Sequence, residues 1–322
     1  MKNTHTILFV FLSWFAHSQT EEIKVFDSKN SPLNVNKITS TEEDLRGNVW
    51  IGTVEGLFIF NGKKWAKLNK ENSQLPSNKI LCVKHHKNKS YIGTSEGLVV
   101  VDGSWTTYNT NNSRLPSNKI RKIEVDNKNN LWIATSAGLC VFNDGFQIKL
   151  SKEKNNIIND DFICLKIDRA GKKWVATNKE LYSFENDIWR VYTLKNSKLP
   201  KGAIWTLEVD FQNRLWVGTK QGVATCLENR WSVFDKKNSP IKNTPIKSLF
   251  SDSYDRVWIG TEKGLFTFDG CGWEKERKKG HLKNIEHVYV DQKDNKWIVT
   301  NKALLVYNKE GVELKEEIIA SK

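Results

Sequence analysis

A four-residue pattern that recurs seven times constrains the fold of this chain more than any other feature. Each copy has an aromatic residue, a β-branched residue, usually a small residue, and a threonine. The copies start at Trp50, Tyr91, Trp132, Trp174, Trp216, Trp258 and Trp297. Successive copies start 41, 41, 42, 42, 42 and 39 residues apart. A period of this length is typical of a protein built as an array of small structural units.

Each unit can be divided into four β-strands. The first is an apolar alternating run, such as residues 120–125, and it ends in a tight turn. In six units the turn begins with an aspartate six positions before the motif aromatic: Asp44, Asp126, Asp168, Asp210, Asp252 or Asp291. In the second unit His86 takes this place, five positions before Tyr91. Aspartate favours such turns because its carboxylate accepts backbone N–H groups. The motif itself has the composition of a buried strand. Hairpin signals such as Asn61-Gly62 then lead to an outer strand that carries a second tryptophan, such as Trp65.

The beginning of the chain resembles the end of a repeat. Residues 25–33 match residues 233–241, the last part of the fifth unit, at seven of nine positions. The N-terminus therefore supplies the final strand of a unit that starts elsewhere, and the seventh unit is the candidate. An array that completes its last unit with its first strand is a closed ring without exposed sheet edges. The sequence predicts an all-β protein, a seven-bladed β-propeller of four-stranded antiparallel blades.

The N-terminal residues have the features of a signal peptide. Lys2 precedes an apolar run over residues 7–15, and Ala16-His17-Ser18 fits a cleavage site. The run is too short to span a bilayer, and no later stretch is long and apolar enough to do so. We therefore expect a signal peptide over residues 1–18, a single domain over residues 19–322, and an exported protein that is periplasmic, secreted or at the cell surface.

The distribution of charge points to no nucleic-acid partner. The chain has a formal net charge of +13, but its lysines are scattered through every repeat and form no run of five like charges. We interpret this charge as solubilising, and we expect a monomer that does not bind nucleic acid. Thirteen tryptophans are present, and most of them recur at repeat positions. Trp205 is the exception in the predicted domain.

The sequence offers no clear metal or catalytic centre, so no cofactor is predicted. Five cysteines lack CxxC spacing and are expected to be buried as small apolar residues. The four histidines after residue 18 are expected to face solvent or lie in turns: His85, His86, His281 and His287. Residues 126–130 and 291–295 are better explained as turns than as calcium loops. Residues 93–97 match the GxSxG pattern, but they form one more copy of a strand-to-strand turn.

The complete repeat resembles a known family. A linker such as Leu75-Pro76-Ser77-Asn78, the turn aspartate, the motif and the outer tryptophan together resemble the two-component regulator propeller repeat. The resemblance covers residues 23 to about 314. It implies a β-propeller like the extracytoplasmic sensor domains of bacterial hybrid histidine kinases, many of which respond to glycans. The chain ends at Lys322, soon after the seventh copy, so we expect recognition without a kinase portion.

The repeats differ most at one position of the innermost strand, next to the linkers between blades. This position is Thr39, Leu81, Arg121, Ile163, Trp205, Lys247 and Glu286 in the seven units. Ligand sites of propellers generally form where such loops converge around the channel. A tryptophan with charged and amide neighbours suits a sugar ring or another amphipathic ligand. The predicted ligand-binding residues at the channel mouth are Trp205, Arg121, Lys247, Glu286, Asn78, Asn118 and Asp160. The alternative is that Trp205 plugs the channel.

Three functions are compatible with these observations. The first is an exported recognition module, of the sensor type, that binds an extracellular ligand such as a glycan, or a protein partner. The second is a lyase or hydrolase that acts on polysaccharides or cyclic peptides, although the sequence shows no acid–base pair on one face. The third is a structural ring that docks proteins. Fold alone does not decide between these functions. We favour the first and expect no enzyme activity, because we identify no catalytic constellation in the sequence.

Overall fold

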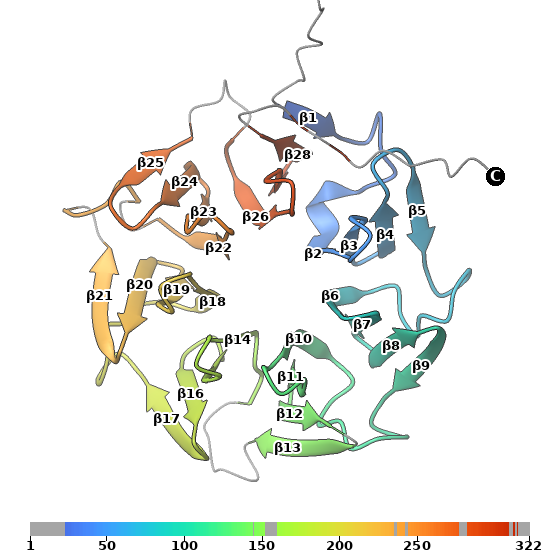
Figure 1. Ribbon diagram of the computed structural model, residues 1–322, viewed down its shortest axis with the longest axis horizontal. Helices are drawn as coiled ribbons and strands as arrows, with labels where there is room; N and C mark the ends of the chain where they lie inside the picture. Colours follow the sequence, from blue (N-terminus) through green and yellow to red (C-terminus); the bar gives the residue numbers. More distant parts are fainter. Residues whose placement is uncertain are drawn as a thin grey trace, which may run out of the picture.

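The computed structural model describes residues 23–143, 145–151, 160–234, 237–241, 244–276, 282–308, 312 and 314, without the side chains of residues 36 and 148. The predicted signal peptide lies outside these residues. The described chain forms seven four-stranded sheets arranged in a ring around a central channel (Figure 1). The pairs within each sheet are antiparallel, for example β2 with β3. The predicted seven-bladed β-propeller is therefore confirmed.

Each blade contributes one strand to each of four concentric positions. The innermost strands are β2 (Ile38–Glu43), β6 (Ile80–His86), β10 (Ile120–Val125), β14 (Cys164–Ile167), β18 (Ile204–Val209), β22 (Ile246–Ser251) and β26 (Ile285–Val290). The second strands are β3 (Val49–Thr53), β7 (Lys89–Thr94), β11 (Leu131–Thr135), β15 (Lys173–Ala176), β19 (Leu215–Thr219), β23 (Val257–Thr261) and β27 (Lys296–Thr300). The third strands are β4 (Gly56–Phe60), β8 (Leu98–Asp102), β12 (Gly138–Phe142), β16 (Leu181–Glu185), β20 (Gly222–Leu227), β24 (Gly264–Phe268) and β28 (Leu304–Tyr307). The outer strands are β5 (Trp65–Leu68), β9 (Ser104–Tyr108), β13 (Phe146–Leu150), β17 (Ile188–Tyr192), β21 (Arg230–Phe234), β25 (Trp273–Lys275) and β1 (Ile23–Phe26). We number the blades 1 to 7 in the order of their innermost strands.

The ring closes through the N-terminal strand, as the sequence predicted. β1 is the outer strand of blade 7 and pairs with β28, with Ile23 opposite Tyr307 and Phe26 opposite Leu304. In Figure 1 these two strands lie side by side although they come from opposite ends of the chain. A short 3₁₀ turn, η1 (Val35–Lys37), then leads into β2 of blade 1. The closure pairs the sheet edge of blade 7 that would otherwise be open.

The motif tryptophan of a blade is held by the turn aspartate that precedes it. In blade 6 the Nε1 atom of Trp258 donates to Asp252 Oδ2 at 2.7 Å. The other carboxylate oxygen accepts the backbone N–H groups of Tyr254 at 2.9 Å and Arg256 at 3.0 Å. We call this arrangement the Asp–Trp clamp. The other five clamps pair Asp44 with Trp50, Asp126 with Trp132, Asp168 with Trp174, Asp210 with Trp216, and Asp291 with Trp297.

The last two motif residues have equally local roles. A Cβ atom on Gly93 would lie 2.5 Å from Cys82 Sγ on the innermost strand and 2.7 Å from Ile120 of the next blade. A small residue is therefore required where these strands approach closely. Thr94 closes the following turn by donating its hydroxyl to the Gly97 carbonyl at 2.8 Å. These two structural roles are sufficient to explain why the motif recurs, so no ligand needs to be invoked.

The apolar core lies between neighbouring blades. One cluster, for example, joins Trp132 and Leu139 of blade 3 to Phe162, Leu165 and Val175 in or beside blade 4. The five cysteines are free, and the prediction that they are buried holds for four of them: Cys82, Cys140, Cys164 and Cys226. It is wrong for Cys271, which is exposed in the hairpin turn before β25. That turn joins the third and outer strands of blade 6, and its residues 269–272 are exposed to solvent.

The two faces of the ring differ in what they carry. On one, which we call the linker face, the linkers between blades contact the turns between second and third strands. The Ser95 N–H, for example, donates to the Lys79 carbonyl at 3.0 Å, and the Lys220 N–H donates to Ala203 at 2.9 Å. The opposite face carries the Asp–Trp clamps, and we call it the clamp face. A search of the described residues found no helix suited to crossing a bilayer.

Candidate ligand channel

The innermost strands enclose a cavity of about 660 Å³ at the centre of the ring. Six of these strands contain a β-bulge directly after their first residue, as in β18, where the register shifts between Ile204 and Thr206. A bulge leaves one residue unpaired and redirects its side chain. The bulged residue is the position that varies between the repeats. All seven residues at this position line the cavity: Thr39, Leu81, Arg121, Ile163, Trp205, Lys247 and Glu286.

Three of the predicted site residues form one group at the channel mouth. The Lys247 ammonium lies 4.9 Å from the centre of the Trp205 ring. The same ammonium forms an ion pair with Glu286, at 3.2 Å. These residues come from blades 5, 6 and 7, so the ring brings together side chains that are about forty residues apart in sequence. Trp205 is half-buried and lines the cavity without filling it.

The fourth predicted side chain in the channel, Arg121, is held by a residue that the prediction did not include. Its guanidinium donates three hydrogen bonds to Asp161, from Nη2 to Oδ2 at 2.8 Å and to Oδ1 at 2.9 Å, and from Nε to Oδ1 at 3.1 Å. Asp161 lies in the linker before β14 and is 41% exposed at its side chain. A guanidinium held in this way has a fixed orientation and still has N–H groups that can reach a ligand.

The three linker residues of the predicted set lie outside the lining of the cavity. Asn78 and Asn118 accept the backbone N–H groups of Lys70 and Thr110, at 2.8 and 2.7 Å. The Asp160 carbonyl accepts the Gly138 N–H at 2.9 Å, next to the turn between β11 and β12. These contacts hold the linkers in place. Ligand binding by Asn78, Asn118 and Asp160 stays a prediction.

Deeper in the channel, five successive blades present charges of alternating sign, which we call the charged arc. Its members are Glu42, Lys84, Glu124, Lys166 and Glu208. Lys84 lies 3.1 Å from Glu42 and 3.8 Å from Glu124. Lys166 lies 2.9 Å from Glu208 and 3.8 Å from Glu124. Blades 6 and 7 complete this level with an aromatic pair, Phe250 and Tyr289, whose ring centres are 5.1 Å apart.

The charged arc keeps its charges because each ion has neighbours of opposite sign. Glu124 raises the pKa of Lys84 against the opposing effect of burial. Burial alone would raise the pKa of Glu124, but the nearby ammonium groups of Lys84, Lys166 and Lys122 lower it. The sequence analysis missed this arc. It could have been found in the sequence, because its five residues occupy the same position in their repeats. In each blade this is the residue that pairs with the motif aromatic.

A second cavity of about 450 Å³ continues from the charged arc to the clamp face. It shares Glu124, Lys166 and Glu208 with the channel lining. Its outer wall includes Phe211, over whose ring the Arg169 guanidinium lies at 3.7 Å. The polar lining of the channel therefore extends toward both faces of the ring.

The expectation for the histidines needs correction. His287 lies in the channel wall, and its Nε2 atom is buried without a partner among the described residues. Burial, assisted by the charges of Lys122 and Lys166, lowers the pKa of His287 to about 3. His85 is also partly buried and packs against Trp50, with ring centres 4.8 Å apart. Only His86 lies in a turn region as expected, and His281 lies outside the described residues.

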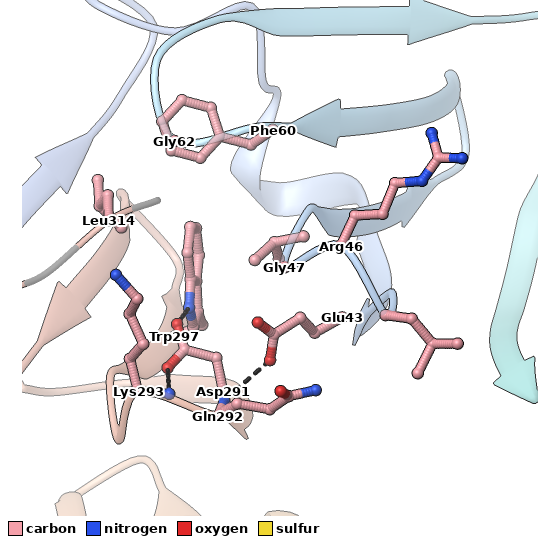
Figure 2. Close-up of a pocket in the computed structure, with 12 residues that line it drawn as sticks. Glu43, Arg46, Gly47, Phe60, Gly62, Asp291, Gln292, Lys293, Trp297 and Leu314 are labelled. Atoms are coloured by element: carbon pink, nitrogen blue, oxygen red, sulfur yellow. Dashed lines mark hydrogen bonds between the residues drawn. The ribbon is translucent and has the colours of Figure 1, made fainter. Parts of the chain in front are cut away.

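A smaller pocket of about 290 Å³ lies on the clamp face between blades 7 and 1 (Figure 2). Glu43 points toward Gln292 and accepts its backbone N–H at 2.8 Å. The Glu43 backbone N–H donates in turn to the Tyr289 hydroxyl at 3.1 Å. Burial raises the pKa of Glu43. Trp297 borders the pocket but is only 1% exposed, so its ring offers little surface to a ligand. We therefore interpret this pocket as part of the packing interface between blades 7 and 1.

The remaining motif residues have structural partners. Ser95 of the GxSxG pattern lies between β7 and β8, where its hydroxyl is 2.8 Å from the Ser77 hydroxyl. The Asp126 carboxylate of the 126–130 turn is held by the N–H groups of Lys128 and Asn130. The part of the chain that the structure describes contains no group of three or more metal-ligating side chains.

The geometry defines the chain as a closed seven-bladed propeller with a polar central channel. Residues 114–137 and 240–263 match the family model described as the two-component regulator propeller. Both segments run from a blade linker through the motif, so the resemblance to this repeat is confirmed. A search of curated proteins found no match.

Solved structures share the fold at low sequence identity. BT3049 from B. thetaiotaomicron is described as a hybrid two-component system, and its extracellular domain matches with a TM-score of 0.71 and 18% identity. The match covers 84% of this chain but 40% of that domain, so this chain spans less than half its length. Virginiamycin B lyase from Staphylococcus aureus matches with a TM-score of 0.67 and 10% identity over 89% of this chain and 99% of the lyase. YCF48 from Cyanidioschyzon merolae matches with a TM-score of 0.66 and 12% identity over 91% of this chain and 100% of YCF48. These similarities establish the fold.

Proposed function

We propose that the protein is an exported recognition module that binds an extracellular ligand at the channel mouth on the linker face. One observation carries this proposal. Trp205, Lys247 and Glu286 stand together on β-bulges at the rim of a cavity of about 660 Å³. A bulge costs ladder hydrogen bonds, and here it directs varied side chains into open space. Residues that served packing alone would repeat like the Asp–Trp clamps.

The chemistry of the mouth suits a glycan. The exposed part of an indole ring offers an apolar face for a sugar ring, while the Lys247–Glu286 pair offers a donor and an acceptor for its hydroxyls. Arg121 and Asp161 offer a second such pair from blade 3 and its linker. The extracellular domain of BT3049 supports export and a sensor-type role by analogy. Export also rests on the signal peptide predicted over residues 1–18, and N-terminal sequencing of the mature protein should then begin at Gln19.

Binding of neutral and acidic oligosaccharides, tested on an array and by thermal shift, examines this proposal directly. Trp205→Ala should weaken saturable binding about tenfold or more, because the stacking surface is lost. Tyr254→Ala is the matched control, since Tyr254 is an aromatic residue on the clamp face and is 65% exposed. The proposal fails if Trp205→Ala keeps wild-type affinity with an unchanged melting temperature.

The same screen separates the competing functions. Recognition would be assigned to the scattered positive charge if only polyanions bound, and if added salt weakened their binding to the same extent in wild type and Trp205→Ala. Chemical conversion of a bound oligosaccharide would indicate an enzyme. Binding of a protein partner that survives Trp205→Ala would favour a structural docking ring.

A further inference from the structure

One cation in the channel forms no ion pair with any carboxylate in the part of the chain that the structure describes. Directly below the mouth, the residue after each bulge forms a second level of the channel wall. The members that line the cavity are Lys122, Cys164, Thr206, Ser248 and His287, and we call them the lysine level. Glu124, whose pKa the charge of Lys122 helps to lower, pairs with Lys84 and Lys166. The Lys122 ammonium itself forms no ion pair with any described carboxylate. The lysines above and below it do, since Lys247 pairs with Glu286 and Lys84 pairs with Glu42.

The other members of the lysine level carry no charge that could neutralise Lys122. Burial keeps the pKa of His287 at about 3, so its ring is neutral at physiological pH. Cys164 donates its thiol to the Trp205 carbonyl at 3.2 Å. The charge of Lys122 helps to lower the pKa of His287, in blade 7, so its field extends across the channel from blade 3. Lys122 is therefore the only charged residue among the described members of this level.

Polar hydrogen-bonding groups share the cavity lining with Lys122. Ser248 Oγ accepts the Val288 N–H at 3.0 Å, which leaves its own hydrogen available as a donor. Thr206 adds a second hydroxyl to the cavity lining. His287 Nε2 is buried with no partner among the described residues, and a buried polar atom without a partner costs free energy. An ammonium with hydroxyl donors nearby is the donor set that a carboxylate requires.

We infer that the lysine level is an anion site, and that it binds a carboxylate group of a ligand that enters past Trp205. The inference rests on the proposed function, because the ligand must enter through the channel mouth. It adds a chemical requirement that the mouth alone does not impose. Lys122 would select acidic ligands over neutral ones of the same shape. Sugar acids are one such class, since their rings fit Trp205 and their carboxylates can reach the level below.

Calorimetric titration with D-glucuronate, D-glucose and acetate tests this inference. Glucuronate and glucose share a ring and differ in a carboxylate against a hydroxymethyl group. Wild type should bind glucuronate about tenfold or more tightly than glucose, and Lys122→Met should remove this preference. Lys122→Gln is a second variant in case Met perturbs the wall. Lys122→Arg should retain part of the preference, because it keeps the positive charge.

Lys128→Met is the matched control, because it removes the same charge from an exposed turn of blade 3. It should leave glucuronate binding unchanged. Equal glucuronate affinity in wild type and Lys122→Met would overturn the anion site. So would equal affinity for glucuronate and glucose in wild type, or no binding of either carboxylate. The proposed function would survive these results if neutral oligosaccharides still bound in a Trp205-dependent way. Loss of Trp205 dependence would instead defeat the proposed function itself.

Discussion

The Asp–Trp clamps and the channel wall belong to the same blades, since each clamp aspartate directly follows an innermost strand of the wall, yet they differ in one respect. The clamp occurs in six of the seven blades with the same atoms and nearly the same distances. The bulge position in the channel differs in every blade and includes Arg121, Trp205 and Glu286. In the clamp of blade 6, both carboxylate oxygens of the aspartate accept hydrogen bonds from groups of the same blade. Lys122 in the channel forms no ion pair with a described carboxylate.

This difference separates structural from functional residues without an alignment. A repeated residue whose polar atoms are all bonded within its own blade is explained by folding alone. A varied residue that a bulge directs into a cavity is not explained in this way, because packing would favour the same solution in each blade. The comparison predicts that clamp substitutions change stability, whereas substitutions at the bulge position change binding.

The largest expected effect is at a clamp. Asp252→Ala removes the acceptor of Trp258 Nε1 and of two backbone N–H groups, and it removes one of the two carboxylate partners of Arg256, the other being Asp294. Unsatisfied buried donors each cost about 1–3 kcal/mol, so the free energy of unfolding should fall by about 3 kcal/mol or more. Urea denaturation would measure this loss.

Blade 2 provides the control for this prediction, since His86 replaces the clamp aspartate there. Its side chain bonds only Asn129, at 2.9 Å in an exposed position. His86→Ala should therefore change the free energy of unfolding by less than about 0.5 kcal/mol. Similar losses in Asp252→Ala and His86→Ala would show that the clamp is not what stabilises a blade.

The next effect concerns the motif strand, which packs against the innermost strands of the channel wall. Gly93→Ala would place a Cβ atom 2.5 Å from Cys82 Sγ and 2.7 Å from Ile120 of blade 3. Overpacking of this kind costs about 1–3 kcal/mol. Thermal unfolding should show the loss, while Gly272→Ala, which meets no atom within 4 Å, should be close to neutral. If Gly93→Ala were as stable as wild type, the blades would be less tightly packed around the channel than the structure indicates.

The sequence was sufficient to predict the fold because its period, turn residues and strand patterns all agree. The match between residues 25–33 and 233–241 predicted how the ring closes, and the pairing of β1 with β28 confirms it. The turn aspartates were assigned correctly to backbone N–H groups. Their bonds to the tryptophans were not predicted, because they depend on how an indole six residues later folds back over the turn.

The channel was harder to predict from the sequence. The bulge position was identified by its variation, and it lines the cavity in all seven blades. The partners of these residues come from other blades or linkers, as Glu286 does for Lys247 and Asp161 does for Arg121. The spacing of residues within one repeat does not indicate which residues of other blades will lie nearby across the ring. The burial of His287 was missed for the same reason, since the residues that surround it lie on other strands.

The smallest expected effect on stability is a dependence on pH that comes from His287. Burial, with the charges of Lys122 and Lys166, lowers its pKa in the folded protein from 6.5 to about 3. The unfolded chain therefore binds a proton below pH 6.5 that the folded protein does not bind, so stability is lost as the pH falls from 6.5 toward 3. The contribution is at most about 1.4 kcal/mol per pH unit, or about 1 kcal/mol between pH 7.5 and 5.5.

Urea denaturation of wild type and His287→Gln at pH 7.5 and 5.5 would measure this contribution. The other titrating groups are common to both proteins and cancel in the comparison, including His85, whose pKa burial also lowers. The wild type should lose about 1 kcal/mol more than His287→Gln between the two pH values. The same substitution at His86, which bonds Asn129 on the exposed side of blade 2, should leave the wild-type pH dependence in place. Equal losses in wild type and His287→Gln would mean that the folded protein protonates His287 in the channel wall. The lysine level would then carry a second cation and would attract an anionic ligand more strongly at pH 5.5 than at pH 7.5.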